Sequence, residues 1–155
     1  MALISKIALY NTDIDVNMFV ENAGQYVVYK ERNLKDYRMH LSKQHNQLEP
    51  TSNAFYESIE IEMDAPEASE SYLQEWFISQ ESRDLVISTT IDIAHSPEGN
   101  ETHQIICKGA ECYSFEDFVV DENTFNAKRR IRIFFEAKMV IIVHNKEIIK
   151  VFKHQ

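Results

Sequence analysis

The stretch of sequence that decides the fold is KRRIRIFFEAKMVIIV, residues 128–143. Apolar side chains occupy every second position of it, and charged side chains hold most of the alternate positions before Met139; the apolar set is Ile131, Ile133, Phe135, Ala137, Met139, Ile141 and Val143. This period of two is typical of a β-strand with one buried face. A single strand over residues 131–143 would be about 43 Å long, which exceeds the ~40 Å diameter of a compact domain of this size. The strand is therefore expected to curl, as in a barrel, or to project into an inter-subunit sheet.

The same alternation recurs in shorter segments along the chain. Strands are predicted at residues 25–30, 37–42, 55–63, 85–93 and 148–152. Residues 105–107 and 113–120 also have strand character, and Lys108–Glu111 lies between them as a predicted tight hairpin turn. Closely spaced strands of this kind indicate a barrel or a sandwich.

One segment has a helical period. Asp64-Ala65-Pro66-Glu67 can begin a helix, and apolar side chains then follow at helical spacing at Tyr72, Leu73, Trp76 and Phe77. The predicted fold is mainly β: a small antiparallel β-barrel of two packed sheets, with one α-helix on its side. Residues 1–155 are expected to form a single domain.

Composition excludes several classes of function. Of the 155 residues 44% are hydrophobic and 26% are charged, and the formal net charge is −9. Such an acidic chain is a poor nucleic-acid binder. Three glycines and two cysteines are too few for repeated phosphate loops, a disulfide framework or a four-cysteine zinc site. The N-terminus does not have the pattern of a signal peptide, and no apolar run reaches the ~18 residues of a membrane helix, so folding in the cytoplasm is expected.

The sequence carries few candidates for catalytic residues. Cys107 and Cys112 flank the predicted turn and would be cross-strand neighbours, either a redox pair or, in our preferred interpretation, two small half-buried side chains. Solvated histidines are favoured over metal ligands because the six are scattered. Glu57, Glu60 and Glu62 fit a solvated strand face better than a general acid and base. We predict no enzyme activity, no catalytic residue, no metal and no cofactor.

The cluster Lys128-Arg129-Arg130 with Arg132 is the densest positive patch of the sequence. Its two favoured interpretations are a basic face that meets the acidic face of a second copy, and a charged edge that prevents aggregation.

A resemblance to a known family rests on the order and spacing of several segments. These are Tyr37–Gln44 with the polar loop to Asn53, Tyr56–Met63, the Leu-x-Glu-Trp helix in Ser71–Trp76, Ile106–Phe118 and the final strand Arg130–Ile142. Together they resemble the type VI secretion tube protein, the haemolysin-coregulated protein (Hcp, TssD) family, in its Bacteroidetes form. Residues 1–20 and 145–155 look like extensions beyond the usual ends of that family.

The resemblance implies a structural protein. Six copies would form a ring, rings would stack into the inner tube of a contractile secretion system, and the lumen would carry effectors. The implied partners are further copies of the chain, secreted effectors and other machine components, with no nucleic acid and no membrane insertion. The protein would assemble in the cytoplasm and be exported through the apparatus without a signal peptide.

The resemblance also suggests interface residues. The loop His45–Asn53, with His45, Gln47 and Glu49, would join stacked rings. Arg130 and Arg132, or Glu60 and Glu62, are candidates for subunit or lumen surfaces, with the choice between the two left open. The alternatives are a monomeric ligand-binding β-barrel, a non-polymerising paralogue that acts as a cargo adaptor, and an enzyme on a barrel scaffold.

Overall fold

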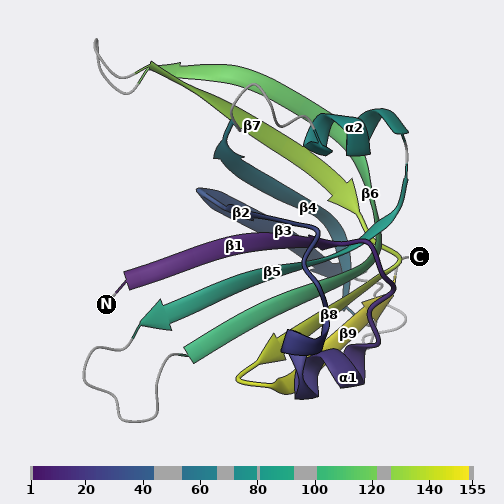
Figure 1. Ribbon diagram of the computed structural model, residues 1–155. Helices are drawn as coiled ribbons and strands as arrows, with labels where there is room; N and C mark the ends of the chain where they lie inside the picture. Colours follow the sequence, from purple (N-terminus) through teal and green to yellow (C-terminus); the bar gives the residue numbers. More distant parts are fainter. Residues whose placement is uncertain are drawn as a thin grey trace.

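The computed structural model describes residues 2–43, 54–65, 72–79, 81–92, 101–121 and 127–153 (Figure 1). The chain order of its elements is β1 (Ala2–Tyr10), α1 (Val16–Glu21), a 3-10 turn (Ala23–Gln25), β2 (Lys30–Asn33), β3 (Asp36–Lys43), β4 (Ala54–Asp64), α2 (Tyr72–Ser79), β5 (Arg83–Asp92), β6 (Glu101–Asp121), β7 (Ala127–Glu136), β8 (Met139–His144) and β9 (Glu147–Lys153). No helix in these ranges has the length and apolar character needed to cross a bilayer.

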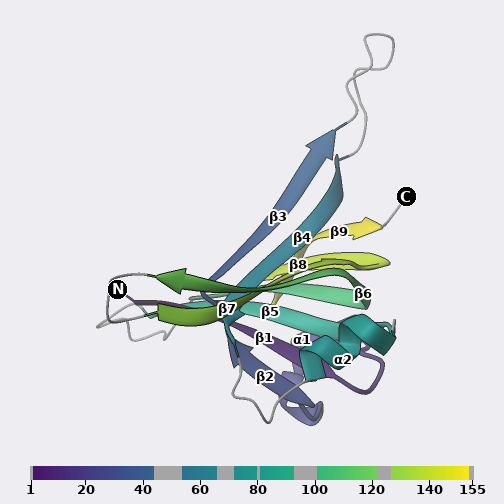
Figure 2. The same ribbon diagram turned by 90° about the horizontal axis from the view of Figure 1, so that it is seen from above.

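The strands form two antiparallel sheets that share β6. The first sheet runs β2-β1-β5-β6-β8-β9, and the second runs β6-β7-β4-β3. Seen from above, β3 and β4 reach beyond the other strands while the remaining sheet curves beneath them (Figure 2). The predicted class, mainly β and antiparallel, is confirmed. The structure has the predicted helix, α2, and in addition the short helix α1.

Strand β6 replaces the predicted hairpin. It is one strand of 21 residues, and no chain reversal occurs at Lys108–Glu111. Its partner changes instead: Lys108 is opposite Met139 of β8, whereas Glu111 is opposite Glu136 of β7. The change is made by a bend at Gly109, whose φ of 63° lies in the left-handed region. The turn-forming residues therefore mark a bend from one sheet to the other.

Replacing Gly109 by alanine is expected to lower the free energy of unfolding by about 1–2 kcal/mol, because side chains other than glycine rarely adopt a positive φ. An added Cβ would also lie 3.1 Å from Cδ of Lys138. Urea unfolding followed by circular dichroism measures the change. Gly24, which has no positive φ, is the control, and Gly24→Ala should change stability by less than about 0.5 kcal/mol. Equal effects of the two substitutions would contradict this role of Gly109.

The single strand predicted over residues 131–143 is also corrected. It is divided into β7 and β8 at Ala137 and Lys138. The backbone N–H of Lys138 donates to the carbonyl oxygen of Lys108 at 2.9 Å, which fixes the break to the bend in β6. After the break the odd-numbered side chains change face: Phe135 lies in the barrel interior, whereas Ile141 lies in a second core on the outer surface.

The N-terminal segment forms an integral part of the sheet. β1 lies between β2 and β5 and pairs with β5 from Ala2 to Tyr10. The chain then returns as α1 over the outer face, where Phe19 and Ile14 bury the outer core with Val86, Ile106, Ile141 and Val143. Residues 2–20 are thus part of the folded domain, and β9 likewise pairs with β8 within residues 145–155. That both ends extend beyond the usual ends of the family stays a prediction. Residues 25–30, predicted as a strand, are mostly irregular, with β2 starting only at Lys30.

The barrel interior is filled by the alternating side chains that the sequence indicates. Ile59, Ile61, Ile133 and Phe135 are fully buried there. Helix α2 covers this core with Leu73 and Trp76, and the Trp76 ring lies 5.9 Å from that of Phe135 between centroids. Asp64, predicted to begin this helix, belongs to β4 instead, and residues 66–71 lie outside the described residues.

Candidate functional site

A ladder of charged side chains covers the outer face of β4, β7 and β6. We define the charged ladder by six residues, Glu60, Glu62, Asp64, Glu116, Arg130 and Arg132. The strand register creates it, since Glu62 and Glu116 both lie opposite Arg132 and Asp64 lies opposite Arg130. Because successive side chains of a strand point to opposite faces, the same strands that bury Ile61 and Ile133 must present these charges outward.

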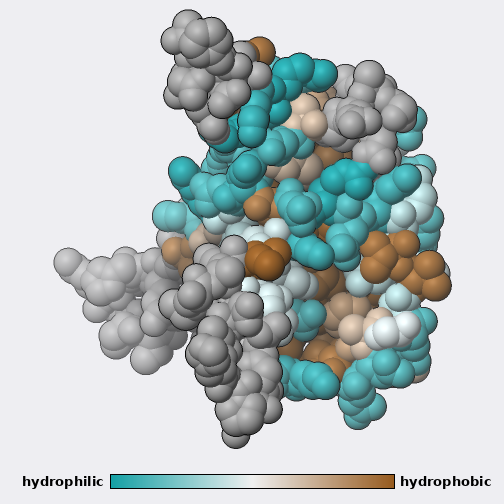
Figure 3. All heavy atoms as spheres, turned by 60° about the vertical axis from the view of Figure 1, so that its left-hand side comes forward, coloured by the Kyte–Doolittle hydropathy of each residue, from teal (hydrophilic) through white to brown (hydrophobic). Residues whose placement is uncertain are grey.

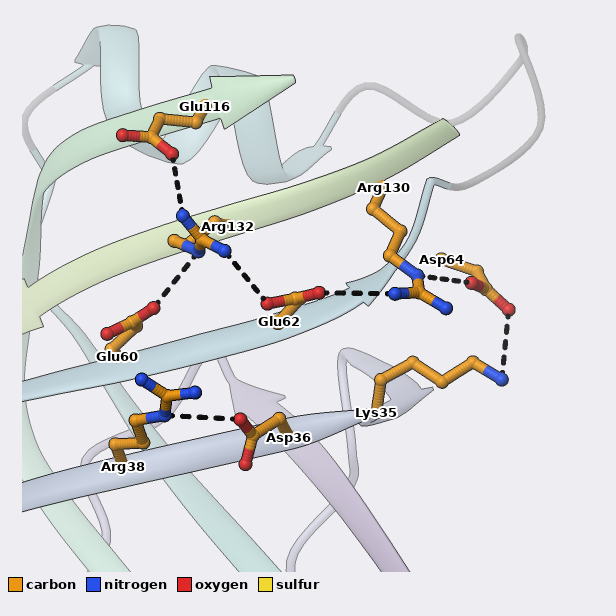
Figure 4. Close-up of polar contacts among 9 residues, drawn as sticks. All are labelled: Lys35, Asp36, Arg38, Glu60, Glu62, Asp64, Glu116, Arg130 and Arg132. Atoms are coloured by element: carbon orange, nitrogen blue, oxygen red, sulfur yellow. Dashed lines mark hydrogen bonds and ion pairs between the residues drawn. The ribbon is translucent and has the colours of Figure 1, made fainter. Parts of the chain in front are cut away.

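Arg132 is the centre of the ladder. Its guanidinium group lies 3.0 Å from Glu60, 3.3 Å from Glu62 and 3.3 Å from Glu116 (Figure 4). It also lies over the ring of Phe118, 5.0 Å from the centroid. The hydrogen bond to Glu62 raises the pKa of Arg132, outweighing the opposing effect of burial. One cation on β7 thereby holds carboxylates from the two strands that flank it, β4 and β6.

Arg130 continues the ladder toward the end of β4. Its guanidinium group lies 3.5 Å from Glu62 and 3.6 Å from Asp64, and Asp64 also lies 3.6 Å from the ammonium group of Lys35 (Figure 4). Both arginines of the ladder therefore have carboxylate partners within the chain. Two guanidinium groups face four carboxylates, so the ladder itself carries net negative charge.

This geometry changes how the basic cluster is interpreted. The sequence suggested a positive face, but Arg130 and Arg132 are paired across strands, and Arg129 pairs with Asp117. Glu60 forms an ion pair with Arg132, and Glu62 forms one with Arg130. The ladder forms a continuous network of ion pairs across β4, β7 and β6. A role as a subunit or lumen surface stays a prediction.

Replacing Arg132 by methionine is expected to lower the free energy of unfolding by about 1 kcal/mol at low salt, because three carboxylates lose their common cation. The effect should shrink at high salt, where the remaining repulsion is screened. Urea unfolding at two salt concentrations tests this. Arg38→Met, which removes an exposed pair with Asp36, should cost less than about 0.5 kcal/mol. A salt-independent loss in Arg132→Met would contradict the electrostatic explanation.

The structure brings together a second polar cluster that sequence reasoning missed. The ammonium group of Lys108, on β6, donates to the carboxylates of Asp13 and Asp84 and to the carbonyl oxygen of Ile14. Asp84 is buried and accepts the backbone N–H of Ile14 at 2.8 Å and that of Gly109 at 2.9 Å. Burial opposes the charge on Lys108, but the hydrogen bonds to Asp13 and Asp84 outweigh it and raise the pKa.

The geometry of the cluster around Lys108 suits a structural role. The cluster links the segment after β1 to the bend in β6. Its two contacting residues Lys108 and Ile14 are 94 positions apart in the sequence. No single motif signals it, because Asp13, Asp84 and Lys108 lie on three separate segments of the chain. The local signal in the sequence is the pair Lys108-Gly109, which interrupts a segment of strand character.

The cysteines do not form a reactive pair among the described residues. Cys107 and Cys112 lie on the same strand rather than across a turn, and both are buried free thiols. Burial raises the pKa of both, to about 11 for Cys112, which disfavours the reactive thiolate.

His103 and His144 face each other on β6 and β8. Burial, followed by the charge of His144, lowers the pKa of His103.

Within the described ranges no three histidine, cysteine or acidic side chains are arranged to hold a metal ion. The predicted ring-joining residues His45, Gln47 and Glu49 lie outside the described residues, as does the side chain of Glu57.

The fold defines the class to which these features belong: an antiparallel β-barrel with a helix on its side, as found in Hcp proteins. Solved structures match it end to end. An Hcp protein matches with a TM-score of 0.66 and 10% identity over 99% of both chains. The secreted protein Hcp3 from Pseudomonas aeruginosa matches with a TM-score of 0.65 and 11% identity, also over 99% of both chains.

Hcp1 from Flavobacterium johnsoniae matches with a TM-score of 0.61 and 13% identity over 97% of this chain and 99% of its own. No protein-family model matches the sequence, and no curated protein gives a significant sequence match. The likeness at these identities is one of fold, and at that level the resemblance to Hcp is confirmed.

Proposed function

We propose that the chain is a structural subunit of a type VI secretion tube, which assembles into hexameric rings that stack and carry effectors in their lumen. The observation that carries this proposal is the end-to-end match, in which 99% of this chain and 99% of an Hcp protein share one fold. Because one fold can host different functions, the proposal is tested below through the assembly of the protein.

The interior of the barrel supports the same proposal. Side chains such as Ile61, Ile133 and Phe135 fill it, and α2 closes it with Trp76. A ligand-binding barrel needs an apolar cavity to hold its ligand. A filled barrel instead leaves the outer surfaces as the places where function resides. On this proposal the protein assembles in the cytoplasm and leaves through the secretion apparatus.

Light scattering after size exclusion, together with negative-stain imaging, tests the proposal. We expect a mass of six times the 18.2 kDa of one chain and rings with a central channel. A single-chain mass at every concentration, with no rings, would contradict it. In that case a small molecule released on denaturation would point to the ligand-binding barrel, and its absence to a cargo adaptor.

A further inference from the structure

A row of polar side chains crosses the first sheet near the start of β6. We define the polar row by four residues that lie opposite one another on neighbouring strands, Ser5, Thr89, His103 and His144. The hydroxyl groups of Ser5 and Thr89 are 3.1 Å apart, and Thr89 also donates to the hydroxyl group of Tyr37 at 3.4 Å. The hydroxyl half of the row is therefore satisfied within the chain, and the two histidines form its other half.

The two imidazoles lie on the same side of the sheet. His103 of β6 is directly opposite His144 of β8, and Figure 1 shows the start of β6 beside the turn that joins β8 and β9. Two residues further into the sheet, Ile105 and Ile142 are also opposite each other; Ile105 belongs to the barrel core and Ile142 packs against it. Because alternate side chains of a strand share a face, both histidines lie on the barrel side of the sheet, at its end.

Both rings are available to a ligand. Their one interaction is with each other, since neither His103 nor His144 has a hydrogen-bond or ion-pair partner among the described residues. His103 is half-buried and His144 is exposed. Figure 3 brings this side of the molecule forward and shows hydrophilic surface that separate apolar patches interrupt. An ion from solvent can therefore reach the pair.

The spacing of the rings fits one shared metal ion. Their centroids are 6.1 Å apart and their planes are tilted by 54°. Zinc–nitrogen bonds are about 2.0–2.1 Å long and a ring centroid lies about 1 Å beyond its nitrogen, so two imidazoles on one ion have centroids up to about 6 Å apart. Rotation of the two side chains is enough to direct a nitrogen of each ring at a common point, with the strands held in place by their pairing.

The donor set selects the kind of ion. Imidazole nitrogens suit zinc, copper and nickel, whereas magnesium and calcium prefer oxygen ligands. Glu147 of β9 lies opposite His144, so a carboxylate continues the row, but it is not arranged with the pair as a third ligand. Water would therefore fill the remaining positions of the ion.

We propose that His103 and His144 form a two-histidine site for a divalent transition-metal ion, with zinc as the ion to test. The bound ion would link β6 to β8 at the end of the barrel. The site goes beyond the proposed function and does not depend on ring assembly.

Titration calorimetry tests the site, with zinc chloride added to the untagged full chain at neutral pH after treatment with a chelator. We expect a saturable site for one zinc ion per chain. Since loss of an outer-shell partner of a metal already costs about 10–100-fold in affinity, His103→Gln and His144→Gln should each weaken zinc binding by about tenfold or more. Zinc should also raise the unfolding temperature of the unmodified chain, and raise it less in the two variants.

Two controls accompany the titration. His40→Gln changes an exposed histidine of β3 that lies opposite Ser58, so it should bind zinc as the unmodified chain does. Magnesium chloride should give no saturable binding. Circular dichroism shows that each variant is folded.

Three results would overturn the inference. The folded, unmodified chain could show no saturable zinc binding. Both variants could bind zinc as tightly as the unmodified chain, which would place the ion on other residues. Only one of the two variants could lose affinity, which would contradict a shared ion. Each of these results leaves the proposed ring untouched, because that proposal is measured by mass and imaging without zinc.

Discussion

Replacing Trp76 by alanine is expected to lower the free energy of unfolding by about 3–5 kcal/mol. The indole is 1% exposed, belongs to the main core and packs against the fully buried Phe135. Its removal leaves a cavity between α2 and the barrel that the surrounding strands cannot collapse to fill. Helix α2 is short, so it relies on this packing for its place on the barrel. Urea unfolding monitored by circular dichroism measures the change.

Two matched variants isolate the packing contribution. Among the described residues the indole Nε1 has no hydrogen-bond acceptor, so Trp76→Phe loses volume but no hydrogen bond and should cost about half as much as alanine or less. Ile78→Ala, on the exposed face of the same helix, should cost less than about 0.5 kcal/mol. A loss of less than about 1 kcal/mol in Trp76→Ala would mean that α2 does not cover the core.

Replacing Asp84 by alanine has the second large expected effect, a loss of about 3–5 kcal/mol. Asp84 is buried, and its carboxylate holds Lys108 together with the backbone N–H groups of Ile14 and Gly109. Removing it leaves one partly buried cation with only the exposed Asp13 as counter-charge, and two donors without their acceptor. The bend in β6 and the start of the α1 segment should both loosen.

The pH dependence provides a second measurement on the same variant. The pKa of Lys108 is raised above its ordinary 10.5 in the folded chain. Its contribution to stability is therefore fully present below pH 10.5 and is lost as the pH rises through the raised pKa. This alkaline loss should be smaller in Asp84→Ala. Asp117→Ala, which breaks the exposed pair with Arg129, should cost at most about 1 kcal/mol and keep the alkaline loss. Indistinguishable alkaline curves for wild type and Asp84→Ala would contradict the assignment.

The candidate site was partly visible in the sequence. Alternation along β4 and β7 placed Glu60, Glu62, Arg130 and Arg132 on outward faces, and the ladder is built on those faces. Their pairing was not visible, because it depends on β4 and β7 being neighbours and on their register. Strand neighbours that are about 70 residues apart have no local signal. The same limit hid the cluster of Asp84 with Lys108.

The sequence by itself determined the strand character, the buried positions and the order of elements that resembles Hcp. Period-two alternation identified Ile59, Ile61, Ile131 and Ile133 as core, because every second side chain of a strand shares a face. Only the tertiary structure decided where strands bend and which apolar face turns inward. Val140 lies in the barrel while Ile141 lies beneath α1. When both faces of a strand are covered, alternation no longer identifies the interior. A bend such as that at Gly109 shifts the period by one residue, so it is recognised only from the strands on either side of it.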